Sequence, residues 1–246
     1  MKRLENKIIV VTGGSGLLGS AFVRKVAEEG GVPVILDKKI EDKDVHSISC
    51  DITSQDSIKN CIDQILDAYG RIDGWINNAY PRTGDWGKAL FENESMDSFS
   101  QNLEWHLGGY VKCCQQALNV MKTLRYGSLI NLSSIYGIVG PDFTIYENTP
   151  IINPSAYAAI KGGLVNMTRY LAAYYGPYGV RVNCISPGGI FDNQPSIFVE
   201  NYEKKVPLKR MGKPEDISPS ACFLLSDDAA YITGHNLVID GGWTVV

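Results

Sequence analysis

A glycine-rich string near the beginning of the chain restricts the possible fold more than any other feature. It reads TGGSGLLG from Thr12 to Gly19 and lies between a β-branched apolar run and a segment with helical apolar spacing. Glycines at a strand-to-helix corner permit a tight turn, close approach of the backbone to a pyrophosphate and close packing of the helix. We therefore predict a dinucleotide site here, rather than a turn that binds nothing.

Along the rest of the chain, apolar runs of strand length alternate with helical segments. Strands are predicted at 8–12, 32–36, 45–50, 75–78, 128–133, 181–185 and 236–240. Helices are predicted at 17–29, 54–69, 96–124 and 155–175, and from Pro214 onward. This alternation predicts an α/β fold of the Rossmann type, a doubly wound parallel sheet with helices on both faces. A length of 246 residues favours a single domain spanning 1–246.

The composition argues against several classes of protein. A formal net charge of −4 disfavours a broad nucleic-acid surface, which needs clustered Lys and Arg. The sequence shows neither a signal-peptide core nor the roughly 18 apolar residues of a membrane helix, so we expect no membrane contact and a cytoplasmic location. The six cysteines show no CxxC spacing and lie in apolar patterns, so we expect buried thiols and no metal site.

Asp37, at the end of the second predicted strand, indicates which dinucleotide is bound. It follows Gly19 by 18 residues, a position where a carboxylate accepts hydrogen bonds from the ribose hydroxyls and repels a 2′-phosphate. We therefore expect NAD. Lys38 and Lys39 keep NADP as the less favoured alternative, because an adjacent cation can compensate a phosphate.

Tyr157 and Lys161 form a Tyr-x-x-x-Lys pair in the helix predicted at 155–175. Side chains at i and i+4 lie on the same helical face. The neighbouring ammonium favours the phenolate, so we expect the pKa of Tyr157 to be lowered toward the range of a general base. Taken alone, such a pair is also consistent with core packing or a surface contact.

Other short motifs accompany this pair. They are the glycine string, Asp51, and the segments 77–79, 131–134, 186–188, 210–216 and 238–243. Their order resembles that of the short-chain dehydrogenases/reductases, in the short single-domain branch, and the resemblance covers essentially the whole chain. It implies an NAD(P)-dependent enzyme that interconverts a secondary alcohol and a ketone.

The same resemblance implies roles for individual residues. Ser134 is implied to form a hydrogen bond with the reacting oxygen of the substrate, and Tyr157 to transfer the proton of that oxygen. Lys161 is implied to hold the nicotinamide ribose. Ser134 is preferred to Ser133 because the family places this serine three residues after the strand asparagine, here Asn131. The implied cofactor-binding residues are Gly13, Ser15, Gly16, Leu17, Leu18, Gly19, Asp37, Asp51, Ile52, Asn78, Ala79, Tyr157, Lys161, Pro187, Gly188, Gly189 and Ile190.

Two departures from the family pattern lie near the implied cofactor. The glycine string reads TGxxGxxG, as in the extended branch that includes sugar-nucleotide epimerases and dehydratases, which puts the geometry of the turn in doubt. Asp192 stands where the family commonly has a threonine that contacts the cofactor. A carboxylate there would repel a diphosphate, so we expect Asp192 to point elsewhere.

Two more departures lie near the implied catalytic residues. His106 replaces an asparagine whose carbonyl positions a water in the proton relay; its backbone can keep that role, its imidazole can join the relay, or it can simply pack. Ser134 and Tyr157 are 23 positions apart, a longer spacing than usual. The added polar stretch, 141–154, is either part of the substrate pocket or a surface or subunit contact. We expect substrate-binding loops at 80–95, 137–154 and 190–210.

The substrate is predicted less closely than the reaction. The sequences of the predicted loops resemble those of oxidoreductases of bacterial surface-polysaccharide and flagellin-modifying sugar biosynthesis. We therefore expect the substrate to be a polar small molecule, a sugar or nucleotide-activated sugar. Arg82 and Lys88 are candidates for holding a phosphate or carboxylate. Alternatives are a 3-oxoacyl thioester or small alcohol as substrate, a sugar epimerase or dehydratase with tightly bound NAD, and a catalytically silent cofactor-binding subunit. The family implies a homodimer or homotetramer.

Overall fold

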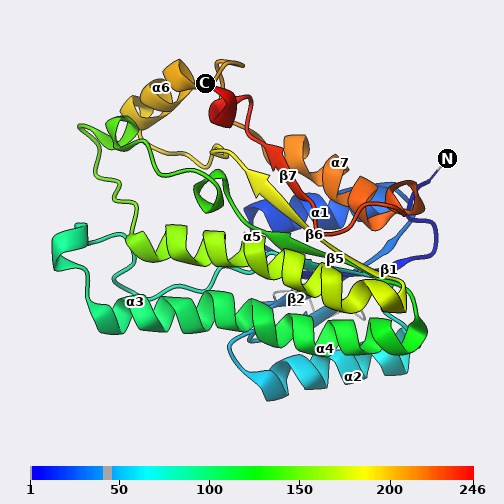
Figure 1. The fold of residues 1–246 in the computed structure, drawn as a ribbon. Helices are drawn as coiled ribbons and strands as arrows, with labels where there is room; N and C mark the ends of the chain where they lie inside the picture. The colour runs from blue at the N-terminus through cyan, green and yellow to red at the C-terminus, as the bar shows by residue number, and fades with distance from the viewer. Residues whose placement is uncertain (1, 41–45) are drawn as a thin grey trace.

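The computed structural model describes residues 2–40 and 46–246, which form one α/β domain (Figure 1). Its centre is a seven-stranded sheet with the order β3-β2-β1-β4-β5-β6-β7, in which every pair of neighbouring strands is parallel. The strands are β1 (Ile8–Thr12), β2 (Val32–Asp37), β3 (Ser47–Ser49), β4 (Gly74–Asn77), β5 (Gly127–Leu132), β6 (Val180–Pro187) and β7 (Asn236–Ile239). The predicted Rossmann-type fold and single domain are confirmed.

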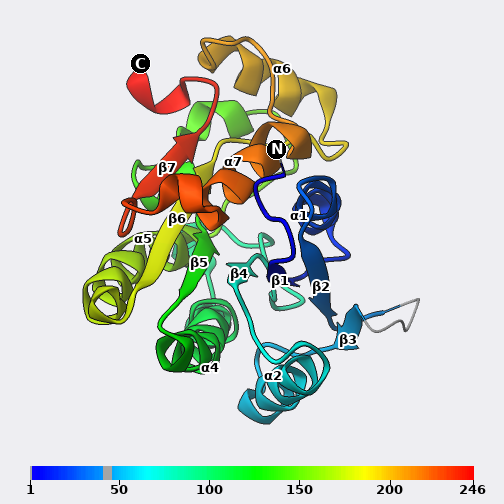
Figure 2. The same ribbon diagram turned by 90° about the vertical axis from the view of Figure 1, so that its right-hand side faces the viewer.

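Helices cover both faces of this sheet (Figure 2). On one face lie α2 (Gln55–Tyr69), α4 (Gly109–Leu124) and α5 (Ser155–Tyr175), and on the other lie α1 (Leu17–Glu28) and α7 (Pro214–Leu225). Each face buries its own apolar cluster against the strands, as a parallel sheet requires. A third, smaller cluster lies beyond the carboxyl ends of the strands, beneath α6 (Ser196–Lys205).

Local sequence signals set the helix ends. Ser54 caps α2, because its side chain accepts a hydrogen bond from the backbone N–H of Ser57, and Gly70 ends the helix in the left-handed conformation with φ of 72°.

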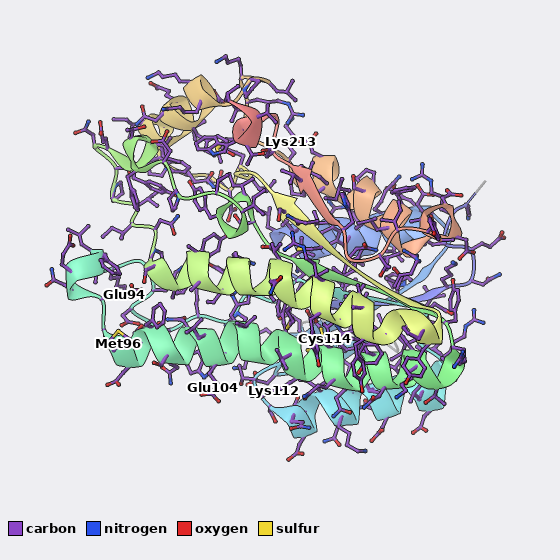
Figure 3. The ribbon with its side chains drawn as sticks, viewed as in Figure 1. Glu94, Met96, Glu104, Lys112, Cys114 and Lys213 are labelled. Atoms are coloured by element: carbon purple, nitrogen blue, oxygen red, sulfur yellow. The ribbon has the colours of Figure 1, made fainter. Side chains whose placement is uncertain are left out.

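The helices turn different side chains toward the sheet and toward solvent. In Figure 3, Cys114 lies on the side of α4 that faces the sheet, whereas Glu104 points outward. All six cysteines are free and buried, as predicted. None of the helices within 2–40 and 46–246 is long and apolar enough to cross a membrane.

The helical stretch predicted at 96–124 is present, but it is not one uniform α-helix. The segment divides into α3 (Met96–Asn102), one π-helical stretch η2 (Leu103–Gly108) and α4. Of the predicted strand at 45–50, Val45 lies outside the described residues. The sequence analysis did not predict α6, nor the 3-10 helices η1 (Phe91–Asn93), η3 (Ile135–Gly137), η4 (Phe143–Tyr146), η5 (Gly176–Tyr178), η6 (Asp227–Ala229) and η7 (Trp243–Val245).

The strand order reverses between β1 and β4, and this point positions the site. Loops that follow these two strands diverge, which opens a crevice at the carboxyl edge of the sheet. The Thr12 side chain ties them together, since its Oγ1 accepts hydrogen bonds from the backbone N–H groups of Asn78 (3.0 Å) and Ala79 (3.1 Å). Asn78 Nδ2 donates in turn to the carbonyl of Gly13 at 3.0 Å. The crevice therefore has a fixed floor.

Candidate active site

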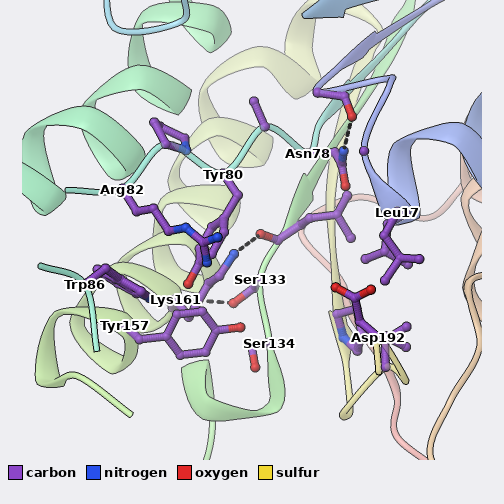
Figure 4. A pocket seen from close by; sticks show the side chains of 18 of the residues that line it. Leu17, Asn78, Tyr80, Arg82, Trp86, Ser133, Ser134, Tyr157, Lys161 and Asp192 are labelled. Carbon is purple, nitrogen blue, oxygen red and sulfur yellow. Dashed lines mark hydrogen bonds between the residues drawn. The ribbon is translucent and has the colours of Figure 1, made fainter. Parts of the chain in front are cut away.

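A cavity of about 870 Å³ occupies this crevice and runs from the glycine string to Tyr157 (Figure 4). Most of the predicted site residues line it. They are Gly13, Gly16, Leu17, Leu18, Asp37, Asp51, Ile52, Asn78, Ala79, Ser134, Tyr157, Lys161, Pro187, Gly188, Gly189 and Ile190. Three predicted residues, Ser15, Gly19 and His106, do not belong to the wall. The cavity joins both predicted ends of the site in one space.

The glycine turn has the geometry of an anion cradle despite its unusual spacing. Gly13 has a φ of +64°, and a Cβ on Gly19 would lie 2.0 Å from the Gly13 carbonyl oxygen. Both positions therefore require glycine, the first for conformation and the second for contact between α1 and the turn. The N-terminal end of α1, with no acidic residue in its first turn, faces the cavity. These residues fit a dinucleotide pyrophosphate.

Asp37 lies at the end of β2 in the cavity wall. Its Oδ2 accepts a hydrogen bond from the backbone N–H of Ser15 at 3.1 Å, so Ser15 contributes to the site through its backbone. Lys38 Nζ forms an ion pair with Asp51 Oδ2 at 2.8 Å. Burial alone would raise the pKa of the Asp51 carboxyl, but hydrogen bonds from Lys38 and Thr53 lower it overall. Lys38 is therefore directed to a carboxylate of the protein.

At the other end, Ser134 and Tyr157 meet through their hydroxyl groups. Ser134 caps η3, and its Oγ accepts the backbone N–H of Tyr136 at 3.2 Å. The hydroxyl proton of Ser134 is thereby left to form a side-chain hydrogen bond with Tyr157. The Tyr157 phenol, on α5, points toward Ser134 in the cavity (Figure 4).

Lys161 lies one helical turn after Tyr157 and is only 5% exposed. Its Nζ donates to the Leu132 carbonyl oxygen at 2.9 Å and lies 5.6 Å from the centre of the Tyr157 ring. The i, i+4 spacing thus brings phenol and amine to the same face, as predicted. Burial lowers the pKa of Lys161 to about 7.

The expectation that the pKa of Tyr157 is lowered is wrong for the protein without cofactor. Burial raises the pKa of Tyr157, and the hydrogen bond from Ser134 offsets this only in part. Lys161 does not lower it because its own pKa is about 7, so its amine is uncharged in the alkaline range where the phenol titrates. The phenol is therefore in its neutral form at neutral pH.

Comparisons with known proteins agree with this arrangement. The sequence model of the family described as enoyl-(acyl carrier protein) reductase matches residues 18–244. The chain is 38% identical to post-translational flagellin modification protein A of Campylobacter coli, over 98% of this chain and 99% of that protein. It is also 30% identical to 7alpha-hydroxysteroid dehydrogenase of Bacteroides fragilis, over 100% of this chain and 97% of that protein. The chain belongs to the short-chain dehydrogenase/reductase superfamily.

A solved relative supports this assignment. The structure of a short chain dehydrogenase from Leptospira borgpetersenii with bound NAD+ superposes with a TM-score of 0.89 at 36% identity, covering 98% of this chain and 94% of that chain. Short-chain dehydrogenases/reductases bind NAD(P) and act on CH–OH groups. The present protein is accordingly an oxidoreductase of that class.

His106, which departs from the pattern of the superfamily, lies behind Lys161 and not in the cavity wall. It belongs to η2 and is 0% exposed. Its Nε2 lies 3.5 Å from Lys161 Nζ, and its ring meets the Tyr80 ring edge-on at 4.9 Å. Burial, with a smaller contribution from the Lys161 charge, holds the pKa of His106 well below its usual range. The neutral imidazole can therefore accept a hydrogen bond from Lys161.

The Ser133 hydroxyl is engaged in a packing contact with α5. Its Oγ donates to the Lys161 backbone carbonyl at 2.8 Å, which holds η3 against α5. Gly137 permits this approach, since a Cβ there would lie 2.6 Å from both Ser133 Oγ and the Lys161 carbonyl oxygen. The preference for Ser134 over Ser133 as the hydroxyl that faces Tyr157 agrees with this geometry.

An aromatic wall around Tyr157 was not predicted residue by residue. Tyr80, Trp86 and Tyr136 all meet the Tyr157 ring edge-on, with centroid separations of 6.1, 6.3 and 6.3 Å. Tyr80 and Trp86 lie within the loop 80–95 that was predicted to bind substrate. Their place in that loop, directly after Ala79, was the only available signal. Arg82, from the same loop, also lines the cavity.

Asp192 corrects another expectation. The carboxylate was expected to point away from the site, yet Asp192 lines the cavity and lies beside Leu17 in Figure 4. Its backbone N–H donates to Gln194 Oε1 at 2.7 Å. A negative charge therefore lies at the cofactor end of the cavity, across from Arg82.

Proposed function

We propose that the protein interconverts a secondary alcohol and a ketone on a sugar or nucleotide-activated sugar, with NAD(H), in the formation of bacterial surface or flagellin glycans. The observation that carries the reaction type is the meeting of Ser134, Tyr157 and Lys161 in the same cavity as the glycine turn. A silent cofactor-binding subunit would have no need to hold these three groups together.

In this proposal Tyr157 is the acid and base. During ketone reduction its neutral phenol donates a proton to the carbonyl oxygen, and during alcohol oxidation its phenolate accepts the hydroxyl proton. When bound, NAD(H) supplies the hydride exchange that no side chain can perform. Because the pKa of Tyr157 is raised, reduction should proceed at neutral pH, whereas the oxidation rate should rise through the alkaline range.

Ser134 and Lys161 assist this proton transfer. The Ser134 hydroxyl, fixed by the Tyr136 backbone N–H, orients the substrate oxygen toward the phenol. Lys161 lies on the same helical face as Tyr157 and is held between the Leu132 carbonyl and His106. Its amine is thus positioned to hold the nicotinamide ribose.

NAD is the proposed cofactor in preference to NADP. The Asp37 carboxylate lines the cavity at the end of β2, where it would repel a 2′-phosphate. The lysine that favoured the alternative, Lys38, is paired with Asp51 at 2.8 Å and is therefore less able to compensate a phosphate.

A polar substrate is supported by the groups around Tyr157. The aromatic rings of Tyr80 and Trp86 offer flat surfaces suited to a sugar ring, and Arg82 offers a cation suited to a phosphate or carboxylate. The inserted segment adds Tyr146 and Asn153 to the same wall. The similarity to a flagellin modification protein points to the same class of substrate.

The proposal is tested by following nicotinamide absorbance with a panel of sugars, nucleotide sugars, simple secondary alcohols and a 3-oxoacyl thioester, each with NAD and NADP. We expect turnover with NAD and a polar sugar. Exclusive turnover of the thioester would overturn the substrate assignment. Copurifying NAD without net absorbance change would favour an epimerase or dehydratase.

The Tyr157→Phe variant tests the mechanism in the same assay. Loss of the phenolic proton should lower kcat by at least about 10²- to 10⁴-fold, the usual contribution of a general acid or base. The dissociation constant of NAD(H), measured by fluorescence titration, should stay within a few-fold. Retained turnover would exclude Tyr157 as the acid and base.

A further inference from the structure

The inserted segment (141–154) delivers two polar side chains to the cavity wall. Tyr146 from η4 and Asn153 both line the cavity, and both reach toward Tyr136 of η3. Asn153 Nδ2 donates to the Tyr146 hydroxyl at 3.1 Å, and the Tyr146 hydroxyl donates to the Tyr136 hydroxyl at 3.0 Å. The segment thus forms a linear chain of hydrogen bonds that ends at Tyr136.

The donor at the start of this chain fixes its direction. An amide nitrogen only donates, so the Tyr146 oxygen accepts, and the Tyr146 proton is then free to be given to the Tyr136 oxygen. Each phenol accepts one bond and passes its own proton forward. Within the described residues, the structure gives the Tyr136 phenolic proton no acceptor, and Tyr136 lines the cavity.

Tyr136 lies next to the proposed reaction centre. Its ring meets the Tyr157 ring edge-on at 6.3 Å, and its backbone N–H holds Ser134. Burial raises the pKa of Tyr136, so its phenol keeps its proton at any working pH. Accepting a hydrogen bond from Tyr146 also polarises the phenol and makes it a better donor.

Contacts with α6 hold the inserted segment in place. Lys205 Nζ pairs with Asp142 Oδ2 at 2.7 Å, and Asn201 Nδ2 donates to the Ile145 carbonyl at 3.5 Å. The Tyr146 ring packs on Phe198 with a centroid distance of 5.5 Å, and Ile145 is 1% exposed. The chain of hydrogen bonds therefore starts from a fixed support.

We propose that Tyr136 is a specificity-determining residue that donates its phenolic proton to a second oxygen of the substrate, and that Tyr146 and Asn153 are positioning residues that direct this proton. The inference rests on the proposed function. It identifies the substrate as a diol or hydroxyketone whose second oxygen lies near the reacting carbon, as in a sugar ring. A simple secondary alcohol would leave the Tyr136 donor unpaired.

The test compares cis-cyclohexane-1,2-diol with cyclohexanol, which differ by one oxygen, and uses kcat/KM with NAD for each. We expect wild-type protein to prefer the diol by about tenfold, the value of one hydrogen bond that is otherwise left unmade. The Tyr136→Phe variant should lose this preference, because its kcat/KM should fall by more for the diol than for cyclohexanol.

The Asn153→Asp variant tests the direction of the chain without altering Tyr136. A carboxylate only accepts, so Tyr146 would donate to it and Tyr136 would donate to Tyr146. The Tyr136 proton would then be withdrawn, and the diol preference should fall as it does in Tyr136→Phe. The matched control is Tyr231→Phe, which removes a fully exposed hydroxyl and should leave the preference intact.

The outcomes separate this inference from the proposed function. If wild-type protein turns over no member of the panel, the proposed function fails, and the diol preference is then measured from dissociation constants by calorimetry. An unchanged preference in both variants would overturn the role of Tyr136. Equal losses for diol and cyclohexanol would overturn it too, because they would indicate a structural role only.

Discussion

The two ends of the cavity are built in different ways. The cofactor end depends on backbone geometry, with Gly13 in a left-handed conformation, Gly19 in contact with the turn, and the end of α1 behind them. The substrate end depends on side chains, with Tyr157, Ser134 and Tyr136 brought together from α5 and η3. The glycine turn of the first end is a contiguous stretch of chain held by hydrogen bonds between Thr12 and the backbone of Asn78 and Ala79, whereas the catalytic side chains of the second end come from separate elements.

This difference explains where the molecule can vary. A backbone cradle accepts few substitutions because most side chains would fill it, and it recognises a cofactor common to the superfamily. Side chains that line a wall can be exchanged one at a time, and an insertion such as 141–154 can add new ones. The following predictions test whether the two ends are separable in this way.

The largest effect is expected from Gly19→Ala. A Cβ at this position would lie 2.0 Å from the Gly13 carbonyl oxygen, so the turn must move. NAD(H) affinity, measured by titration, should fall by about 100-fold or more, a loss of about 2.7 kcal/mol. The matched control is Gly176→Ala, where a Cβ would meet no atom within 4 Å. Equal effects at both glycines would contradict the requirement for close contact.

The next effect is a change of cofactor preference in Asp37→Ser. Removing the carboxylate should remove the repulsion of a 2′-phosphate, so the ratio of kcat/KM for NAD to that for NADP should fall by about 30-fold. Substrate KM should not change if the two ends are separable. Asp67→Ser, which removes an exposed carboxylate of α2, is the control. A wild-type preference for NADP would refute the role of Asp37 outright.

Lys161, which stands between the two ends, should make stability depend on pH. Its pKa is about 7 in the folded protein and 10.5 in the absence of burial, so the penalty for burying its charge is complete below pH 7. Between these values unfolding takes up a proton, and the free energy of unfolding should rise with pH by up to about 1.4 kcal/mol per unit.

The Lys161→Met variant checks this linkage by urea denaturation of the protein without cofactor. Its free energy of unfolding should exceed that of wild type near pH 7, and the difference should shrink toward pH 10. If the free energy of unfolding depended on pH in the same way in both proteins, a group other than Lys161 would cause this dependence.

The smallest effect is expected at Arg82, which lines the cavity, in comparison with Lys88, which does not. Arg82→Gln should raise the KM for a nucleotide sugar about fivefold, the range of one partly exposed charged hydrogen bond. The KM for a neutral sugar should not change. Lys88→Gln should alter neither value, and matching effects of the two substitutions would mean that the attraction is only a general surface charge.

Much of the fold could be predicted from sequence because its signals are local. The helix at Ser155–Tyr175 has the predicted bounds, and the helix predicted at 54–69 is observed at Gln55–Tyr69. The π-helix at Leu103–Gly108 could not be predicted, since its extra residue is accommodated by packing against α5 and carries no local signal.

The site divides in the same way. The meeting of Ser134, Tyr157 and Lys161 in one cavity could be predicted from their motifs, but the direction of the Tyr157 pKa shift could not, because it depends on how deeply the phenol is buried. Asp192 was placed wrongly because the prediction rested on charge repulsion with a bound diphosphate and not on the path of the chain, which brings Asp192 to the cavity. Tyr136 gave no signal, since its importance depends on contacts with Tyr146 and Asn153 that the irregular segment between them makes only in the folded chain. The dimer or tetramer stays a prediction.

The π-helical stretch at Leu103–Gly108 acts as a phase shift between α3 and α4. Each residue of an α-helix turns the chain by about 100°, so deleting one residue here would rotate one helix against the other by that angle. Either His106 would leave Lys161, or the buried row of α4 would turn toward solvent. The one extra residue therefore keeps His106 beside Lys161 while the buried row of α4 stays away from solvent. In a deletion scan, we expect deletions in this turn to be far less tolerated than deletions in α3 or α4.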